Sequence, residues 1–579
     1  MSIFIKLGWF FKREKRHYIA AIIELAITTT LGLLPPVIIG KIIDQISRRS
    51  LSLADLWLFL ALLLLIALLL YVISYFQSFN FWSGAFKLDT LLRARLFRHF
   101  LKMDANFYQK HRTGDLMAHA TNDVMAVQDV AGMGIITLAT ALVSGGFTVI
   151  AMIFAVDWRL TLLALIPLPL IAVEAKVLGD KVHDAFKISQ DMFSKMTDKV
   201  QESITGMKTL KTFGQEQADI ADFEQKLIDI NDSYTQVNRY DALFDPLITL
   251  SVGISYTLAI IVGGEFIVHH IITLGQLVAF VTYIDMLIWP MFALGMLFNI
   301  LQKGAASYSR VDELLHEETQ VIDQTNGVLP KRQADFEIRI IDFAYPEDSG
   351  TSLHQVQISL PQGKMLGIVG KTGAGKSTIL KLLLREFDGY IGQITYGGSD
   401  IRELSMDSYL PLIGYVPQEH FLFSASVADN IRFAAPEATQ EQVEAVARLA
   451  AIHTDILHFA NGYETLVGER GVSLSGGQKQ RLSIARALLV DSELLILDDA
   501  LSAVDAKTEV EILRNLKNDR KQTTIIVAHR LSSVMYADEI IVMDGGTIAE
   551  RGTHTELIAL GGWYAQMWAL QKIGEGEQD

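Results

Sequence analysis

The stretch Gly370-Lys371-Thr372-Gly373-Ala374-Gly375-Lys376-Ser377 fits the pattern G-x-x-x-x-G-K-[ST], which wraps nucleotide phosphates. It follows the apolar run Leu366–Val369 and precedes a helical pattern, which is the context that such a loop requires. Glycines let backbone N–H groups surround the phosphates, and the start of the helix adds a favourable dipole. Lys376 is expected to reach the β- and γ-phosphates, and Ser377 to ligate Mg²⁺. Together with Thr378, the stretch forms the predicted phosphate-binding part of an ATP site.

The sequence around this loop alternates between short β-branched runs and helical segments from Phe336 onwards. That alternation predicts an α/β domain built on a largely parallel sheet. The runs expected to form strands are Ile338–Ile341, Leu366–Val369, Ile413–Val416, Leu494–Leu497 and Thr523–Val527.

Two neighbouring carboxylates, Asp498 and Asp499, come directly after the apolar run Leu494–Leu497. A carboxylate at the carboxyl end of a strand beside a phosphate loop is where a metal site is expected, so Asp498 is a predicted Mg²⁺ ligand. Asp499 is placed to activate a water for attack on a phosphate. An Asp pair alone is typical of a solvated loop, and only the phosphate loop favours the catalytic interpretation.

A second anion cradle is expected at Leu474-Ser475-Gly476-Gly477-Gln478, which opens a helical segment. The serine hydroxyl and the backbone N–H groups at this helix start are suited to hold phosphate. One nucleotide seldom needs two such cradles from one domain. We therefore expect two domains that face each other, each supplying one cradle to each nucleotide.

Residues 1 to about 310 have the composition of a membrane domain. Three segments lack charge and are long enough to cross about 30 Å of hydrocarbon, namely Leu56–Ile73, Val130–Val156 and Pro246–Gly264. Three more carry one acid each, namely Tyr18–Gly40 with Glu24, Leu160–Lys176 with Glu174 and Ile271–Asn299 with Asp285. The alternative for these last three segments is that they are buried helices of a soluble domain. Their spacing along the chain and the three charge-free segments beside them favour six transmembrane helices.

Basic residues decide the expected orientation. The cluster Lys12–Arg16 and the segments Lys87–Arg112 and Lys176–Lys211 are rich in Lys and Arg, which favours the cytoplasmic side. We expect a multi-pass protein of the bacterial cytoplasmic membrane whose N-terminus and nucleotide-binding domain are cytoplasmic. The predicted domains are a transmembrane domain over residues 1–315 with two long intracellular loops, a linker over 316–334 and a nucleotide-binding domain over 335–579.

Composition excludes several other classes of protein. The 579 residues include 50 basic and 65 acidic side chains, a net charge of −15, which argues against a nucleic-acid partner. Cysteine is absent, so the chain has no disulfide, thiolate metal site or cysteine nucleophile.

The motif Leu474–Gln478 resembles the signature motif of the ATP-binding cassette (ABC) transporters, and further motifs follow the order of that family. The resemblance implies that Tyr345 stacks on adenine, that Gln418 touches Mg²⁺ and that His529 contacts the γ-phosphate. On its own, each of these residues fits an ordinary structural or surface role. Two loops also resemble the family, namely Glu469-Arg470-Gly471 as the exporter-specific loop and Ser502-Ala503-Val504-Asp505 as the loop that crosses to the partner domain.

Six spans followed by one cassette resemble an exporter half-transporter. The segments around Phe107-Tyr108, Thr113–Asp115, Asn122–Val124 and Gly206–Glu216 resemble the two intracellular loops, whose short helices would transmit movement to the cassettes. From periodicity alone they are ordinary amphipathic helices. The resemblance implies ATP-driven export, with membrane lipids and hydrophobic or cationic small molecules as partners.

The family normally has Glu at the position of Asp499. Asp keeps the charge but withdraws the carboxylate, and a misplacement of about 1 Å can cost on the order of 10²-fold in rate. We therefore expect slow hydrolysis at this chain's own phosphate loop. With an intact signature, the chain resembles the BmrC-type, degenerate-site subunit of bacterial heterodimeric multidrug exporters. The alternatives are a homodimeric exporter of lipids or drugs with two slow sites, and an ATP-gated channel or regulator on the same scaffold.

The acids inside the predicted spans differ in depth. Asp285 is expected near the middle of the bilayer, where a carboxylate should face a cavity or a partner. Contact with cationic substrates is one interpretation of Asp285, and a paired structural acid is the other. Glu24 and Glu174 are expected nearer the inner surface, which their side chains can reach.

Overall fold

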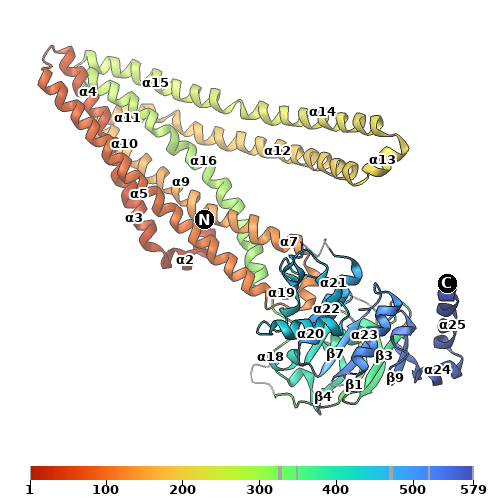
Figure 1. Cartoon of the computed structure of the whole chain (residues 1–579). Helices are drawn as coiled ribbons and strands as arrows, with labels where there is room; N and C mark the ends of the chain where they lie inside the picture. Colours follow the sequence, from red (N-terminus) through yellow and green to blue (C-terminus); the bar gives the residue numbers. More distant parts are fainter. Residues whose placement is uncertain (1, 324–328, 347–349, 469–473, 519–521, 577–579) are drawn as a thin grey trace. The chain divides into compact units, whose positions relative to one another are not determined.

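The structure, a computed structural model, describes residues 2–323, 329–346, 350–468, 474–518 and 522–576 (Figure 1). The chain forms two compact units. The first contains Met1–Leu101 and Thr113–Glu317, and the second contains Lys102–Arg112 and Glu318–Asp579. The short segment Lys102–Arg112 thus folds with the second unit, although residues of the first unit flank it in the sequence.

The first unit has six helical stretches that are long and apolar enough to span a membrane, in the part of the chain that the structure describes. Each is 33 to 53 residues long, so most extend well beyond the roughly 20 residues that a bilayer needs. They comprise α3 (Lys15–Gly32) with α4 (Leu34–Ser47); α5 (Leu53–Phe100); α7 (Thr113–Ala118), α8 (Val124–Asp129), α9 (Ile135–Ala139) and α10 (Gly145–Ala155); α11 (Trp158–Leu165) with α12 (Leu168–Thr205); α14 (Glu216–Asp241) with α15 (Phe244–Val268); and α16 (Leu274–His316).

Several spans are not one continuous α-helix. The first span divides at Leu33, just before Pro35 and Pro36, because proline cannot donate the backbone hydrogen bond of a helix interior. The third span contains three π-helical turns, at His119–Asp123, Val130–Gly134 and Thr140–Ser144. By contrast, α16 continues through Pro290.

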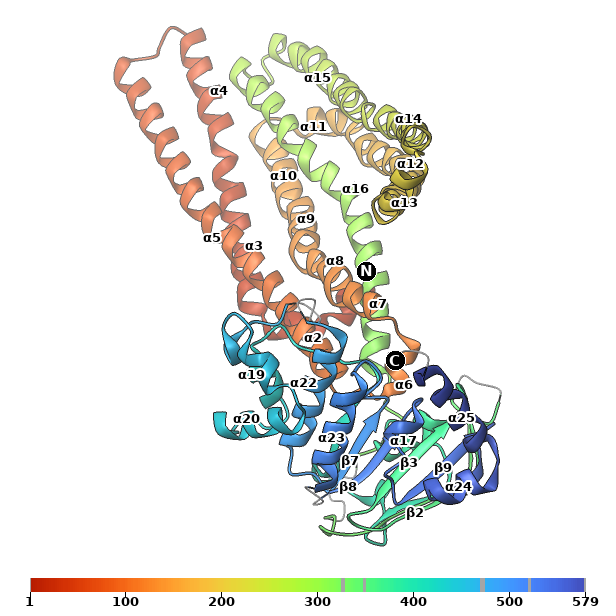
Figure 2. The ribbon, with the colours of Figure 1, turned by 45° about the vertical axis from the view of Figure 1, so that its right-hand side comes forward.

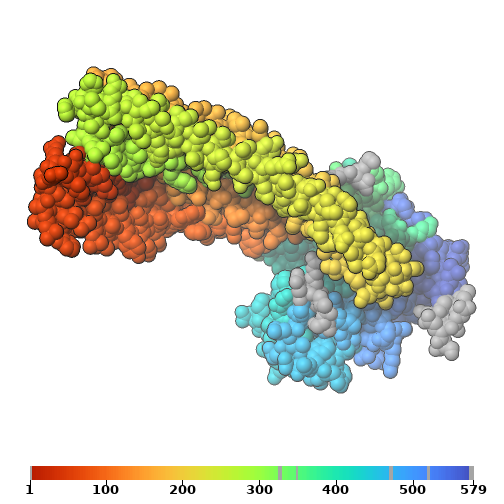
Figure 3. Space-filling model, turned by 90° about the horizontal axis from the view of Figure 1, so that it is seen from above, coloured from red at the N-terminus to blue at the C-terminus, as the bar shows by residue number. Residues whose placement is uncertain are grey.

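The helices α12, α13 (Met207–Phe213) and α14 form a long hairpin, whose α13 end diverges from the other helices of the first unit (Figures 1 and 2). Its end around α13, coloured yellow, lies on the surface of the molecule (Figure 3). The two long arms hold each other, because Lys199 of α12 forms ion pairs of 2.8 and 2.9 Å with Asp219 and Asp222 of α14. In the described structure, α13 has no buried residue and α14 has only Ile230, so these two helices of the hairpin are largely exposed.

The second unit is built on two sheets. A six-stranded sheet has the order β10-β9-β3-β8-β7-β6, and all its pairs are parallel except β10 with β9. Its strands are β3 (Met365–Gly370), β6 (Ile413–Val416), β7 (Leu494–Asp498), β8 (Thr523–Val527), β9 (Glu539–Asp544) and β10 (Thr547–Gly552). An antiparallel sheet has the order β2-β1-β4-β5, formed by β1 (Phe336–Phe343), β2 (Leu353–Leu360), β4 (Ile391–Tyr396) and β5 (Ser399–Asp400).

The predicted fold class, six membrane helices followed by an α/β nucleotide-binding domain, is therefore confirmed. The central strands β7 and β8 are buried along their whole length, as expected for a parallel sheet covered on both faces. The remaining helices of this unit are α6 (Ala105–Lys110), α17 (Lys376–Leu383), α18 (Met406–Tyr409), α19 (Val427–Arg432), α20 (Gln440–Leu449), α21 (His453–Leu457), α22 (Gly476–Leu489), α23 (Ala506–Asn518), α24 (His554–Leu560) and α25 (Trp563–Gly576).

The short helix α6 is joined to the second unit by packing of Ala105 against its core and by hydrogen bonds of the Asp104 carboxylate. Asp104 caps α6 by accepting from the backbone N–H of Phe107 at 3.0 Å. Its other oxygen accepts from the Thr319 hydroxyl at 2.9 Å and from the backbone N–H groups of Gln320 and Val321 at 2.6 and 3.2 Å. Burial opposes ionisation, but these hydrogen bonds outweigh it and lower the pKa of Asp104.

Replacing Asp104 by Asn is expected to loosen α6 without unfolding the unit. Asn is also a good helix cap, but its neutral side chain accepts weaker hydrogen bonds from residues 319–321 than a carboxylate does. The change should weaken the attachment of α6 by about 1–2 kcal/mol. Hydrogen exchange of residues 105–110 should become roughly tenfold faster, whereas Asp407→Asn, at an exposed helix start, should leave it unchanged. Because the folded pKa is lowered, the carboxylate stabilises this contact above about pH 4 and ceases to do so as pH falls through the folded pKa. Unchanged exchange in Asp104→Asn would show that the carboxylate does not hold α6.

Candidate functional site

A cavity of about 610 Å³ opens at the carboxyl ends of β3, β7 and β8, which lie side by side in the six-stranded sheet (Figure 2). Parallel strands place their carboxyl ends at one edge of a sheet, so segments that are distant in sequence meet there. The predicted site residues that line this cavity are Tyr345, Thr372, Gly373, Gly375, Lys376, Ser377, Thr378, Gln418, Asp498, Asp499 and His529. Gly370, Lys371 and Ala374 complete the phosphate loop but do not line the cavity.

The phosphate loop has the backbone that its glycines predict. Gly373 and Gly375 have φ values of +79° and +93°, a region that side chains disfavour. Gly375 precedes α17, so the helix start faces the cavity. The Lys376 ammonium donates to the carbonyls of Gly370 and Lys371 at 3.0 and 2.9 Å, and its side chain is buried. Burial lowers the pKa of Lys376, whereas the nearby Asp498 and Asp499 raise it.

The predicted metal ligands form a compact group. The Ser377 hydroxyl donates to Asp498 Oδ1 at 3.1 Å, and Gln418 lines the same cavity. Asp498 is buried. Burial raises its pKa, the bond from Ser377 lowers it, and repulsion from Asp499 raises it further. A carboxylate, a hydroxyl and an amide oxygen are hard donors that suit Mg²⁺, which usually takes its other ligands from phosphates and water. These residues therefore fit Mg²⁺ bound together with a nucleotide.

Asp499 has a tightly held backbone. Its φ is +50°, a left-handed conformation that Asp adopts more readily than most residues. Its N–H donates to the Val527 carbonyl at 2.8 Å, and its own carbonyl accepts from the Ser502 hydroxyl at 3.0 Å and from Gln480 Nε2 at 3.5 Å. Strand β8, helix α22 and the loop at Ser502 thus all fix the position of Asp499, so its carboxylate can move only by rotation of a short side chain. Sequence reasoning missed Gln480, which no motif distinguishes.

Tyr345 and His529 lie on the cavity wall, as the resemblance implies. The Tyr345 hydroxyl lies 3.1 Å from the Thr378 hydroxyl, and its ring packs edge-on against Phe343 and Phe387. The Lys381 ammonium also lies over this ring, 5.5 Å from its centroid. His529 follows β8, and its carbonyl accepts from the Gln571 amide at 2.9 Å. Their roles with nucleotide stay predictions.

The signature residues form a separate cradle. Ser475 and Gln478 form a capping box at the start of α22. The Ser475 hydroxyl accepts from the Gln478 N–H at 3.3 Å, and the Ser475 N–H donates to Gln478 Oε1 at 3.0 Å. Ser475 and Gly476 are exposed, and a Cβ on Gly477 would come within 2.8 Å of the Ala503 carbonyl. The described residues that line the ATP cavity include none of these four. The predicted loop Glu469–Gly471 lies outside the described residues.

Each membrane acid has a neighbour that donates to it. Both carboxylate oxygens of Glu24 accept from Asn80 Nδ2 at 3.0 Å, and Glu174 accepts from the Ser251 hydroxyl at 3.0 Å. These two acids therefore bind polar groups of neighbouring spans. Asp285 is exposed on α16 and accepts from the Tyr256 hydroxyl of α15.

The sequence matches two family descriptions, "ABC transporter transmembrane region" over residues 18–291 and "ABC transporter" over residues 353–502. It is 43% identical over 574 residues to the "Multidrug resistance-like ATP-binding protein MdlA" of Escherichia coli, covering 99% of this chain and 97% of that protein. The chain belongs to the ABC exporters. It is also 40% identical over 578 residues to the "Probable multidrug resistance ABC transporter ATP-binding/permease protein YheI" of Bacillus subtilis, covering 100% and 99% of the two chains.

A solved structure supports the same conclusion for the whole length of this ABC exporter. The "Structure of a bacterial Atm1-family ABC exporter with ATP bound" matches with a TM-score of 0.76 and 26% identity, covering 97% of this chain and 98% of the other. The chain is thus a multi-pass membrane protein whose ATPase domain couples ATP hydrolysis to export. ABC exporters function as dimers, often with a second half-transporter.

Proposed function

We propose that this ABC exporter is one subunit of a heterodimer that exports amphipathic small molecules, hydrophobic or cationic, across the bacterial cytoplasmic membrane. Its own phosphate loop forms a slow ATP site, and its signature completes a competent site on the partner. The N-terminus and the nucleotide-binding domain are then cytoplasmic. The multidrug names of both relatives support the substrate class.

The geometry of Asp499 carries the proposal. Four hydrogen bonds hold its backbone against β8, α22 and the Ser502 loop. A general base must come within hydrogen-bond reach of the attacking water. Because the backbone is held in place, it cannot move toward the water to compensate for the shorter side chain. The Asp carboxylate therefore lies about one C–C bond farther from the water than a Glu carboxylate would. Charge is retained, so binding of Mg²⁺ and ATP should persist while hydrolysis is slow.

The separate signature cradle supports a two-chain arrangement. Its exposed serine and glycine are not among the described residues that line the cavity of this chain's own phosphate loop. They are therefore available to a nucleotide on another chain. The hairpin of α12 to α14 also supports a two-chain arrangement, because it exposes large apolar side chains. Phe213 is 71% exposed and Ile204 is 67% exposed.

Each group of residues then has one task in the ATP cycle. Lys376, the loop N–H groups and the start of α17 bind the phosphates, and Tyr345 holds the adenine. Ser377, Asp498 and Gln418 would hold Mg²⁺, which would supply positive charge to offset that of the phosphates. Asp499 would orient the attacking water, and His529 the γ-phosphate. Helices α6 and α13 would pass the closure of the two cassettes on to the spans.

Co-purification from the native cell tests the heterodimer. We expect a second cassette subunit, with Glu at the position of Asp499, to accompany this chain at a one-to-one ratio. A complex that contains only this chain and hydrolyses ATP rapidly would contradict the proposal and favour the homodimer. Substrate export into vesicles against a gradient separates an exporter from an ATP-gated channel, which would only dissipate the gradient.

Asp285 provides a prediction about substrate charge. Asp285→Asn is expected to reduce transport of a permanently cationic dye several-fold while sparing a neutral one, because the amide no longer attracts a cation. Tyr256→Phe is the matched control, since it removes the hydrogen bond but keeps the carboxylate, and it should preserve cation transport. Equal losses for both dyes in Asp285→Asn would show that Asp285 is a structural acid.

A further inference from the structure

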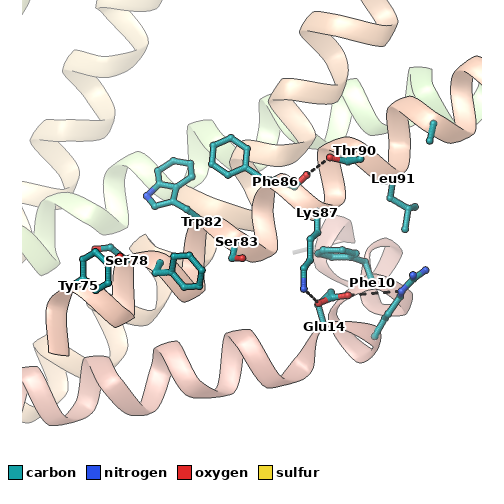
Figure 4. A pocket seen from close by; sticks show the side chains of 13 residues that line it. Phe10, Glu14, Tyr75, Ser78, Trp82, Ser83, Phe86, Lys87, Thr90 and Leu91 are labelled. Atoms are coloured by element: carbon teal, nitrogen blue, oxygen red, sulfur yellow. Dashed lines mark hydrogen bonds and ion pairs between the residues drawn. The ribbon is translucent and has the colours of Figure 1, made fainter. Parts of the chain in front are cut away.

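A groove of about 940 Å³ lies in the first unit between the N-terminal helix α2 (Gly8–Arg13) and the second span, α5 (Figure 4). None of the nucleotide-binding motifs falls in it. Figure 4 shows Tyr75 and Ser78 at one end, and Phe10 with the Lys87–Glu14 ion pair at the other. The groove is therefore amphipathic along its length, with an aromatic end and a charged end.

The aromatic wall consists of Tyr75, Phe79, Trp82 and Phe86, which recur at helical spacing on one side of α5. Tyr75 is 65% exposed, and Phe79 and Phe86 are each 57% exposed. From Tyr75 to Lys87 the helix rises by about 18 Å, close to the depth of one leaflet of the hydrocarbon core. The wall therefore has the length and character to hold an acyl chain.

The charged end favours an anion. Arg13 and Lys87 share a single acid there, since Glu14 lies 3.9 Å from Arg13 and 3.0 Å from Lys87. Glu14 is only 18% exposed, whereas Arg13 and Lys87 are 64% and 49% exposed. The two cations thus face outward and the carboxylate is covered by them. His17 Nε2, 2.9 Å from Lys87 Nζ, helps to fix the lysine.

The surroundings reinforce this charge. Residues 2–18 contain five basic side chains against one acid, although the whole chain carries a net charge of −15. Basic clusters next to a span bind anionic lipids of the inner leaflet, each Lys or Arg improving binding by about fivefold. A cationic amphiphile is a poorer occupant, because Glu14, the one acid among the described residues that line the groove, is already paired.

We propose that this groove binds an anionic phospholipid of the inner leaflet, with the phosphate at Arg13 and Lys87 and an acyl chain along the aromatic wall of α5. Such a lipid would join α2 to α5 at the membrane surface. The inference does not depend on the proposed heterodimer.

The absence of cysteine allows a direct test in the assembled transporter. Ser83→Cys, inside the groove, carries a fluorophore, and Ser74→Cys, exposed on the same helix outside the groove, carries the control fluorophore; the unsubstituted complex provides the labelling background. The complex is reconstituted in phosphatidylcholine with a small fraction of brominated phosphatidylglycerol or brominated phosphatidylcholine. We expect quenching at Ser83→Cys to favour phosphatidylglycerol by at least fivefold, and quenching at Ser74→Cys to show no preference.

Three charge variants decide where the preference comes from. Arg13→Gln with Lys87→Gln should abolish it, whereas Lys12→Gln with Lys15→Gln removes the same charge outside the groove and should preserve it. Glu14→Gln should strengthen the preference, a gain that misfolding cannot produce. Equal loss in both double variants would overturn the proposal in favour of diffuse attraction.

Two further results would also overturn it. Displacement of the brominated lipid by soluble glycerol phosphate would show that the groove binds only the free headgroup. Failure of Ser83→Cys to react with a lipid-soluble maleimide in the assembled complex, while Ser74→Cys reacts, would show that the partner subunit covers the groove.

Discussion

Asp499→Glu is expected to raise ATP hydrolysis at this chain's phosphate loop by about 10²-fold. The backbone at position 499 is held by bonds to Val527, Gln480 and Ser502, so the added methylene moves the carboxylate toward the water rather than displacing the chain. ATP affinity should change little because the charge is unchanged. The measurement is single-turnover hydrolysis in the assembled transporter, with the partner's site inactivated.

Two comparisons make this result specific. Asp499→Asn removes the base without changing the size of the side chain, and it should lower the residual rate while preserving nucleotide binding. If Asp499→Glu leaves the rate unchanged and the wild-type site already turns over rapidly, the carboxylate of Asp499 is an adequate base and the site is not slow.

Gly477→Ala in this chain is expected to lower the steady-state ATPase of the complex by about 10²-fold. The new Cβ would lie 2.8 Å from the Ala503 carbonyl, so the cradle must shift, and loss of preorganised donors to a transferring phosphoryl group costs about that much. The effect falls on the partner's competent site, because the signature is separate from this chain's own cavity.

The matched variant is Lys376→Met, which removes the phosphate-binding ammonium from this chain's own site. The proposed slow site predicts that Lys376→Met reduces the steady-state rate far less than Gly477→Ala does. Nucleotide trapping, resolved by subunit, shows which chain retains ATP in each variant. Equal losses from the two substitutions would indicate two equivalent sites and hence the homodimer.

The sequence determined the elements whose signals are local. The predicted strands Ile413–Val416 and Thr523–Val527 coincide with β6 and β8, because short runs rich in β-branched residues favour strands of a covered parallel sheet. Six spans followed from the apolar segments. The phosphate loop, Asp498, Asp499, Gln418 and His529 converge on one cavity, as expected from their positions at strand ends.

Tertiary structure alone decided the features that depend on long-range contacts. The antiparallel sheet of β1, β2, β4 and β5, the attachment of α6 through Asp104 to residues 319–321, and the groove between α2 and α5 join segments with no shared local signal. The sequence shows that residue 499 is Asp, but only the fold shows that β8, α22 and the Ser502 loop hold its backbone. Hydrogen-bond periodicity and hydrophobic pattern are encoded over a few neighbouring residues, whereas the position of a carboxylate relative to a phosphate depends on how distant strands and loops pack.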